Sequence, residues 1–357
     1  MWCFKNTNFT LLDCDFYSLI YEFEKNLKVS KQTNMRNVFI KGTGSYAPEN
    51  IVKNDFFESI GSSDEWIYSH LGIKERRIST GETTSDLAYK AGLKAIENAG
   101  LTANEIDLIL VATTTPDRQA PSCASMVQEK LQAFNAVAFD VAAVCSGALF
   151  TTAVGVQFIK TGMYDTVLVI GADTFSNIID WERRDAVFFG DGAGAMVLSN
   201  TEEDKGFIDF ILHTDGRGKE HFTIPAGGSE KPTSHETIDN RLHYFQMNGK
   251  EVYKTAVKVV PECINEILIK NNISIDNIAF LIPHQPSIGI LKEIAQKVNL
   301  PFEKVKTNMD RYANTSGGTI PIVLDETHRN GEFKEGDLLL FAAVGAGWTW
   351  GTALYKW

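Results

Sequence analysis

The sequence predicts an α/β protein made of two similar halves that pack about a pseudo-twofold axis. Helical patterns alternate with strands of five to seven residues, as they do in layered α/β proteins. These strands are apolar throughout, so helices must cover both faces of each sheet. The chain has 357 residues, which exceeds the size at which a single core usually stops growing.

An internal repeat supports the two halves. Helical patterns over residues 88–99 and 257–270 each precede a turn and an apolar strand, and Ile278 lies 172 residues after Ile106. The four repeated strands are 106–111 and 167–171 in the first half, and 278–282 and 338–342 in the second. We therefore expect halves at residues 35–205 and 206–357, joined near 200–210.

Composition excludes several classes of protein. The net charge of -11 and the pI near 5.2 argue against nucleic-acid binding, which depends on neutralising phosphates. The mean hydropathy is -0.12 and no run of 18 apolar residues occurs, so no membrane-spanning helix is expected. The five scattered cysteines indicate reduced thiols in the cytoplasm, and their spacing predicts neither a disulfide framework nor a zinc site.

Residues 1–34 are expected to be an extension of the main fold, with Met35 opening the domain proper. Asp13 and Asp15 interrupt any apolar signal-peptide core, and no small-residue cleavage site follows. Apolar residues at helical spacing also allow a short amphipathic helix that docks on the body or on a partner: Phe16, Leu19, Ile20, Phe23 and Leu27.

Cys145 is the first candidate for chemistry. It follows a predicted buried strand at 137–144 and precedes a predicted buried helix at 148–161. The partial positive charge at a helix N-terminus favours thiolate over thiol, and thiolate is the reactive form. An isolated cysteine of this kind is more often a small core residue, so its neighbours decide the interpretation.

The repeat brings two further residues into consideration. Asn314 lies 169 residues after Cys145, and both precede a turn of small residues and a helix. His284 follows the strand at 278–282, and carboxyl ends of strands are where ligands bind in such sheets. Alone, His284 is more often structural and Asn314 more often a cap or turn residue.

Together, Cys145, His284 and Asn314 offer a nucleophile and two neutral hydrogen-bond donors. That set suits thioester chemistry, in which the cysteine takes an acyl group and the donors hold an enolate oxygen. It suits a hydrolytic dyad less well, because no carboxylate is visibly placed to orient the histidine.

Two glycine clusters have different interpretations. Residues 189–194 lack dinucleotide-binding spacing and lead into a strand, so they indicate a tight turn. Residues 345–351 indicate either a packing bulge or a source of backbone N–H groups for an oxyanion. The remaining histidines lack metal-binding spacing, and no metal site is predicted: His70, His213, His221, His235, His243 and His328.

Eight short motifs occur in order and resemble those of a known family. One is Asp140-Val-Ala-Ala-Val-Cys145-Ser-Gly147, and the complete set spans residues 42–48, 63–67, 72–76, 140–147, 189–194, 283–285, 314–316 and 349–351. From about Met35 to Trp357 the chain resembles the β-ketoacyl-acyl carrier protein synthase III family, which has the thiolase fold. The resemblance implies a layered αβαβα arrangement.

The resemblance also implies roles for individual residues. Cys145 is the acylated nucleophile, and His284 and Asn314 bind the thioester oxygen of a malonyl-type extender. The backbone N–H groups of Cys145 and Ala346 form the oxyanion hole. Trp66 and Arg183 match the pair that holds the adenine of coenzyme A. The family usually has glycine where Ala346 stands, which keeps the amide donor.

Three departures from the family pattern concern the substrates. His70 and Gly289 stand where the fatty-acid enzymes have arginines linked to coenzyme A and to carrier-protein docking. Ala120 replaces a bulky residue that reaches into the partner subunit's acyl tunnel. We therefore expect a primer longer than acetyl.

The implied reaction condenses an acyl-CoA primer with a malonyl thioester on acyl carrier protein, without a further cofactor, in fatty acid biosynthesis. The alternatives are a condensing enzyme of secondary metabolism that joins larger β-ketoacyl units, and a cysteine-dependent acyltransferase or thioesterase. A homodimer is expected, with apolar segments at 122–131 and 171–179 as candidates for its interface.

Overall fold

Two mixed β-sheets with the same strand pattern form the framework. The computed structural model describes residues 36–357, so the amphipathic helix considered at 16–27 lies outside the described residues. The first sheet has the order β1 (Asn37–Tyr46), β7 (Gly192–Thr201), β6 (Thr166–Asp173), β4 (Leu108–Ala112) and β5 (Val137–Val141). The second has the order β8 (Gly206–Thr214), β13 (Thr349–Lys356), β12 (Leu338–Gly345) and β11 (Ile278–Pro283).

The strand directions in the two sheets correspond. In the first sheet β4 and β6 are parallel, whereas β7 is antiparallel to both β6 and β1. In the second sheet β11 and β12 are parallel, whereas β13 is antiparallel to both β12 and β8. A single parallel bridge between Leu281 and Val305 takes the place of the β4–β5 pairing. This correspondence confirms the predicted fold of two similar halves.

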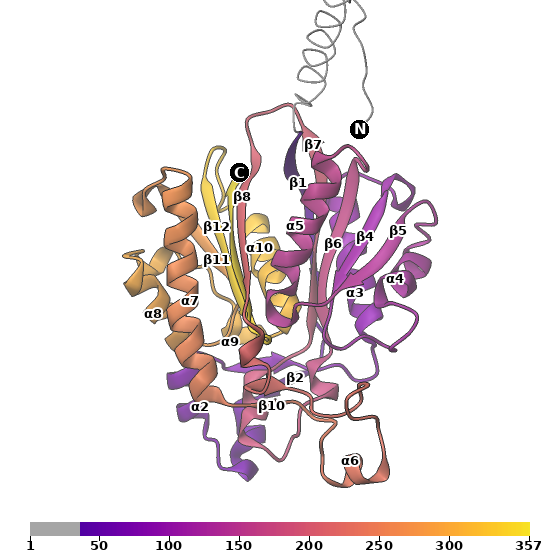
Figure 1. Cartoon of the computed structure of the whole chain (residues 1–357), viewed down its shortest axis with the longest axis vertical. Helices are drawn as coiled ribbons and strands as arrows, with labels where there is room; N and C mark the ends of the chain where they lie inside the picture. Colours follow the sequence, from indigo (N-terminus) through magenta and orange to yellow (C-terminus); the bar gives the residue numbers. More distant parts are fainter. Residues whose placement is uncertain (1–35) are drawn as a thin grey trace, which may run out of the picture. The chain divides into compact units, whose positions relative to one another are not determined.

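Six helices complete the layers that the sequence predicts (Figure 1). The helices α3 (Thr84–Asn98) and α4 (Cys123–Leu131) cover the outer face of the first sheet, with an apolar core beneath them. The helices α7 (Gly249–Lys270) and α8 (Ile288–Lys297) cover the outer face of the second sheet. Between the sheets lie α5 (Gly147–Lys160) and α10 (Thr319–Arg329), which bury side chains against both.

The smaller elements gather at one end of the sheets (Figure 1). They are α2 (Asp64–Leu71), α6 (His235–Asp239), α9 (Met309–Tyr312), β2 (Ile51–Lys53), β3 (Glu75–Arg77), β9 (Phe222–Thr223) and β10 (Gln246–Met247). An aromatic cluster including Phe175, Phe189 and Phe245 forms their core. These elements surround the carboxyl ends of the parallel strands, where the sequence places the site.

The strand before Cys145 differs from its prediction. It ends at Val141, and its residues are exposed or half-buried where the sequence predicted a buried strand to residue 144. The reason is its place at the edge of the first sheet, where β4 is its neighbour within the described chain. Apolar composition alone does not distinguish such an edge from a covered strand.

Helix α7 contains a proline, and α8 compensates for it. Pro261 has no N–H group for the carbonyl of Val257 four residues earlier. The ammonium group of Lys297 in α8 donates to that carbonyl at 2.8 Å. The helix therefore continues through Pro261, and the two helices are joined there.

Residues 37–357 form one unit by their internal contacts, and β7 and β8 within it are separated by a short turn. The division at residues 205 and 206 stays a prediction. Within the described range 36–357, every helix is too short or too polar to cross a bilayer.

Candidate active site

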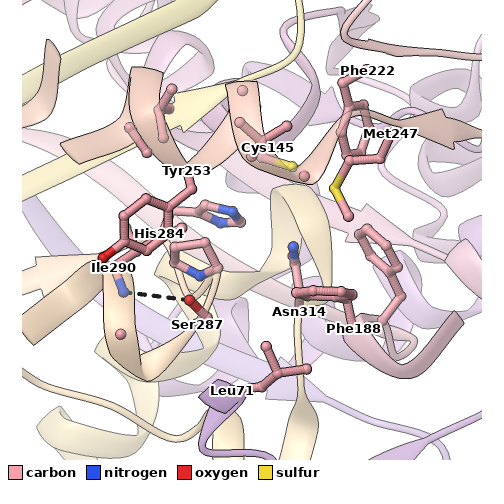
Figure 2. Close-up of a pocket in the computed structure, with 18 of the residues that line it drawn as sticks. Leu71, Cys145, Phe188, Phe222, Met247, Tyr253, His284, Ser287, Ile290 and Asn314 are labelled. Carbon is pink, nitrogen blue, oxygen red and sulfur yellow. Dashed lines mark hydrogen bonds between the residues drawn. The ribbon is translucent and has the colours of Figure 1, made fainter. Parts of the chain in front are cut away.

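A cavity of about 280 Å³ brings the three predicted residues together. The side chains of Cys145, His284 and Asn314 converge on it from three chain segments (Figure 2). Its walls are mainly apolar and include Leu71, Phe188, Phe222, Met247, Ala256 and Ile290. Electrostatic interactions act strongly in such an apolar environment, so correctly placed donors stabilise a developing negative charge.

Cys145 is presented by a sharp turn between β5 and α5. It sits in a 3-10 turn, Val144–Ser146, directly before the first residue of α5. Val144 has a φ of 48°, a left-handed conformation that is strained for a β-branched residue. Strain of this kind concentrates at functional sites, where surrounding packing maintains it. The turn places the thiol at the helix N-terminus, as predicted.

The protonation state of Cys145 differs from the expectation. Burial raises the pKa of its thiol to about 12, although the Ser316 side chain opposes this increase. The sequence indicated the helix N-terminus but not the depth of burial, and desolvation disfavours the charged form. The resting residue is therefore a neutral thiol.

The turn between β12 and β13 lies against the Cys145 loop. A Cβ on Gly345 would lie 2.9 Å from the carbonyl oxygen of Ala143 and from the backbone nitrogen of Ser146, so this close approach requires glycine. The Thr349 hydroxyl is 2.6 Å from that of Ser146 and donates to the carbonyl of Ala346 at 3.2 Å. Ala346 lines the cavity, and the β12–β13 pairing runs through without a register shift. The bulge considered for residues 345–351 is therefore absent from this pairing.

His284 is fixed at the end of β11. Its backbone N–H donates to the carbonyl of Ala342 at 2.8 Å, and its Nδ1 lies 2.8 Å from the Thr319 hydroxyl. Burial lowers the pKa of His284 to about 3, so the ring is neutral. The Thr319 hydroxyl also donates to the carbonyl of Ser316 at 2.9 Å, and it has one proton for these two acceptors. When that proton turns to Nδ1, the proton of the neutral ring is on Nε2, which is then a donor.

Burial of neutral His284 makes stability depend on pH. Its pKa falls from 6.5 to about 3 on folding, so the unfolded chain binds more protons between these values. The free energy of unfolding therefore decreases as pH falls through this window. Between about pH 7 and pH 5, we expect the melting temperature of the wild type to drop more than that of His284→Asn. Equal drops in parallel thermal melts would contradict this expectation.

The side-chain amide of Asn314 has one defined orientation. Its Oδ1 accepts a hydrogen bond from the backbone N–H of Ser316 at 2.8 Å. Its backbone also bridges to the first half, because its N–H donates to the carbonyl of Phe188 at 3.0 Å. With Oδ1 engaged, the NH₂ group is free to serve as the donor toward the cavity (Figure 2).

Asp173 joins two loops of the site, and this role was not predicted from the sequence. It is buried at the end of β6 and accepts hydrogen bonds from the backbone N–H groups of Thr114, Thr115 and Gly317 at 2.7–3.1 Å. Burial raises the pKa of Asp173, and these hydrogen bonds oppose that increase. The carboxylate thus ties the loop after β4 to the loop that carries Asn314. A lone aspartate after an apolar strand was the available sequence signal.

Of the two residues matched to coenzyme A binding, Trp66 lines the cavity and Arg183 does not. Trp66 and His70 line the cavity mouth and stack with ring centroids 4.9 Å apart. Arg183 pairs with Asp185 at 2.7 Å, whereas the guanidinium of Arg184 lies 5.1 Å from the Trp66 ring centroid. The structure therefore places Arg184, not Arg183, over the tryptophan.

Gly289 and Ala120, the other two departures from the family pattern, lie in different parts of the structure. Gly289 lines the cavity mouth, and its Cβ position lies 3.7 Å from the carbonyl oxygen of His70. Ala120 is exposed on the single chain and precedes a cis peptide bond to Pro121.

A second cavity of about 290 Å³ begins beside the first. The two share Phe222 and Ala346, and Val144, the residue before the nucleophile, lines the second. Its other lining residues are Thr114, Phe175, Lys219, Thr223, Ile224, Phe245 and Gly347. The site therefore has two compartments that meet near the Cys145 loop.

Comparisons with known proteins identify the family of the chain. Sequence profiles described as 3-oxoacyl-[acyl-carrier-protein] synthase III and its C-terminal part match residues 139–216 and 268–357. A β-ketoacyl-[acyl-carrier-protein] synthase III from Caldanaerobacter subterraneus subsp. tengcongensis is 46% identical over 89% of this chain and 97% of its own.

Solved structures give the same result. A 3-oxoacyl-[acyl-carrier-protein] synthase III from Aquifex aeolicus superposes with a TM-score of 0.84 at 39% identity, covering 90% of this chain and all of that one. The priming β-ketosynthase of the R1128 polyketide pathway superposes with a TM-score of 0.83 at 27% identity, covering 90% of this chain and 97% of its own. The chain belongs to the β-ketoacyl-[acyl-carrier-protein] synthase III family of condensing enzymes.

Proposed function

We propose that this chain joins an acyl primer to a malonyl-type extender by decarboxylative Claisen condensation on Cys145. The convergence of Cys145 with His284 and Asn314 on one apolar cavity carries this proposal. The Thr319 hydroxyl and the Ser316 N–H orient the ring and the amide respectively. The matched β-ketoacyl-[acyl-carrier-protein] synthase III enzymes support a role in fatty acid biosynthesis, which we assign here, in the cytoplasm.

The first half-reaction loads the cysteine. The sulfur of Cys145 attacks the carbonyl carbon of an acyl-CoA, and the N–H groups of Cys145 and Ala346 receive the negative charge on the oxygen. The bond to the coenzyme A sulfur breaks, and the proton of the resting thiol ends on that leaving group. Because Val144 and Ala346 border the second cavity, the acyl chain extends into it.

The second half-reaction forms the carbon–carbon bond. Asn314 Nδ2 and His284 Nε2 hold the thioester oxygen of the extender while its carboxylate leaves as carbon dioxide. The electron pair of the broken bond forms an enolate, whose carbon attacks the acyl-cysteine carbonyl. The sulfur of Cys145 departs and takes a proton from solvent. Neutral donors suit this step, since a cationic group near the carboxylate would stabilise the ground state.

The carrier and the oligomer follow from surface features and the family. Acyl carrier protein and coenzyme A deliver the two substrates, with no further cofactor. His70 and Gly289 stand where arginines would strengthen anion binding, so binding here depends less on that charge. The edge strand β5 exposes Val137, and Phe134 beside it is 68% exposed, which supports a homodimer through this edge.

Loading the chain with primers of different length tests both the proposed function and the predicted wide acyl tunnel. Purified chain receives acetyl, octanoyl and longer acyl-CoA thioesters, and mass spectrometry measures acylation of Cys145. We expect the longer primers to load faster than acetyl, because Ala120 has no bulky side chain to reach into the acyl tunnel of the partner subunit. Strict acetyl preference would overturn the tunnel argument.

Carbon dioxide release separates condensation from the alternatives. Adding malonyl thioester to the acylated chain should release carbon dioxide and form the β-ketoacyl product. Acylation followed by hydrolysis alone would indicate a thioesterase and contradict the proposal. A second candidate is a priming synthase of secondary metabolism, favoured by Ala120, His70 and Gly289. Product analysis with β-ketoacyl primers identifies it.

A further inference from the structure

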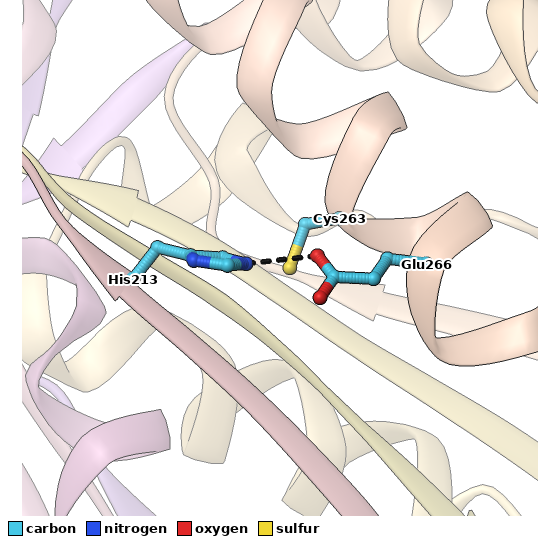
Figure 3. Close-up of side chains that lie close together, drawn as sticks. All are labelled: His213, Cys263 and Glu266. Carbon is cyan, nitrogen blue, oxygen red and sulfur yellow. Dashed lines mark hydrogen bonds and ion pairs between the residues drawn. The ribbon is translucent and has the colours of Figure 1, made fainter. Parts of the chain in front are cut away.

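A histidine, a cysteine and a glutamate meet on the outer face of the second sheet, away from the substrate cavity (Figure 3). His213 comes from β8, and Cys263 and Glu266 come from α7, which packs over that strand. One donor atom from each residue lies within 4.8 Å of the other two. These residue types are the usual protein ligands of zinc.

Neighbouring groups hold the three side chains toward one another. Cys263 and Glu266 are three residues apart in α7, so they share one helix face. The His213 ring stacks on Trp350 with centroids 5.3 Å apart, and its Nε2 lies 2.8 Å from Glu266 Oε2. The sulfur of Cys263 is 3.4 Å from the Thr352 hydroxyl. Imidazole and thiol are therefore positioned before any ion arrives.

We propose that His213, Cys263 and Glu266 form a zinc-binding site. In a tetrahedral zinc site the donors lie roughly 2.0–2.3 Å from the ion, and hence about 3.5 Å from one another. Closing the widest separation here takes about 1 Å of movement. Glu266 is half-exposed and His213 partly exposed, so rotation of their side chains supplies it without moving the backbone.

The resulting site has an open position. The ion takes His213 Nε2, a Glu266 carboxylate oxygen and the Cys263 thiolate, and the thiol proton passes to solvent on binding. Water fills the fourth position, because both Glu266 and His213 reach the surface. This site was not predicted from the sequence, because His213 lies 50 residues before Cys263 and the ligands lack a spacing motif.

Cobalt substitution tests the site through the metal's own spectrum. We use the full chain carrying Cys3→Ser, Cys14→Ser and Cys145→Ala, so that these thiols cannot contribute. One equivalent of Co²⁺ should give a thiolate-to-cobalt charge-transfer band and visible bands of tetrahedral intensity. Zn²⁺ should displace the cobalt, and competition with a chromogenic chelator then gives the Kd for zinc.

Single substitutions in that background decide the assignment. Cys263→Ser should remove the charge-transfer band, and His213→Gln or Glu266→Gln should each raise the Kd for zinc at least about tenfold. Cys123→Ser changes another buried thiol and should leave both readouts unaltered. A charge-transfer band that survives in Cys263→Ser would overturn the site. Unchanged zinc affinity in both surface variants would do so even if Cys263→Ser fails to fold.

Discussion

Cys145→Ala should abolish acylation of the chain, whereas Asn314→Ala should keep acylation and lose condensation. Cys145 is the only cysteine in the described lining of the substrate cavity. Its replacement therefore removes the nucleophile of the first covalent step. Asn314 contributes a donor to the extender oxygen, a role confined to the second step. Loss of one oxyanion donor typically costs about 100- to 1,000-fold in rate.

Mass spectrometry follows the first step, and carbon dioxide release from a malonyl thioester follows the second. Cys123→Ser is the matched control, because Cys123 is a buried thiol at the start of α4, outside the cavity lining. The control should retain both steps. If Cys145→Ala is still acylated, or if Asn314→Ala loses acylation as well, the assigned roles are wrong.

Gly171→Ala should strongly destabilise the chain and disturb the Asn314 loop. A Cβ on Gly171 would lie 2.0 Å from the carbonyl oxygen of Gly317 and 2.7 Å from its carbonyl carbon. Both atoms are backbone, so relief requires the loop after Asn314 to move away from β6. Overpacking of this kind typically costs about 1–3 kcal/mol. We expect a clearly lower melting temperature and slower condensation.

Gly228→Ala is the control for this substitution. Nothing lies within 4 Å of a Cβ at Gly228, so the added methyl group meets no neighbour. Thermal unfolding should separate the two variants, with Gly228→Ala close to the wild type. Indistinguishable melting temperatures would show that the approach of β6 to Gly317 tolerates a side chain.

The two similar halves of the fold could be predicted from the sequence, because the same pattern of helices and strands occurs twice along the chain. The offset between Ile106 and Ile278 was sufficient to predict matching sheets, and the same logic placed Asn314 opposite Cys145. His284 followed from its place at a strand end. These inferences depend on local pattern and on the symmetry of the fold, which a sequence displays.

Other features could not be predicted, because they depend on how deeply a residue is buried and on contacts between segments far apart in the sequence. Burial sets the pKa of the Cys145 thiol, and position along the chain does not reveal burial. Asp173 acts through backbone donors from two other loops, so nothing beside it in the sequence marks its role. The choice between Arg183 and Arg184 depends on how one short turn is rotated. Adjacent residues of the same type cannot be separated by spacing.

Lys297, which supplies the hydrogen bond that Pro261 cannot, affects the rigidity of the cavity wall. Lys297 fastens α8 to α7 there, and its ion pair with Glu293 extends to the Tyr253 hydroxyl on α7. The wall of the cavity built by these helices is therefore braced. We therefore expect adjustment to substrates of different size to occur in the facing wall, where Phe188, Phe222 and Met247 lie (Figure 2). A methionine there is a compliant filler, because its unbranched thioether readily changes rotamer.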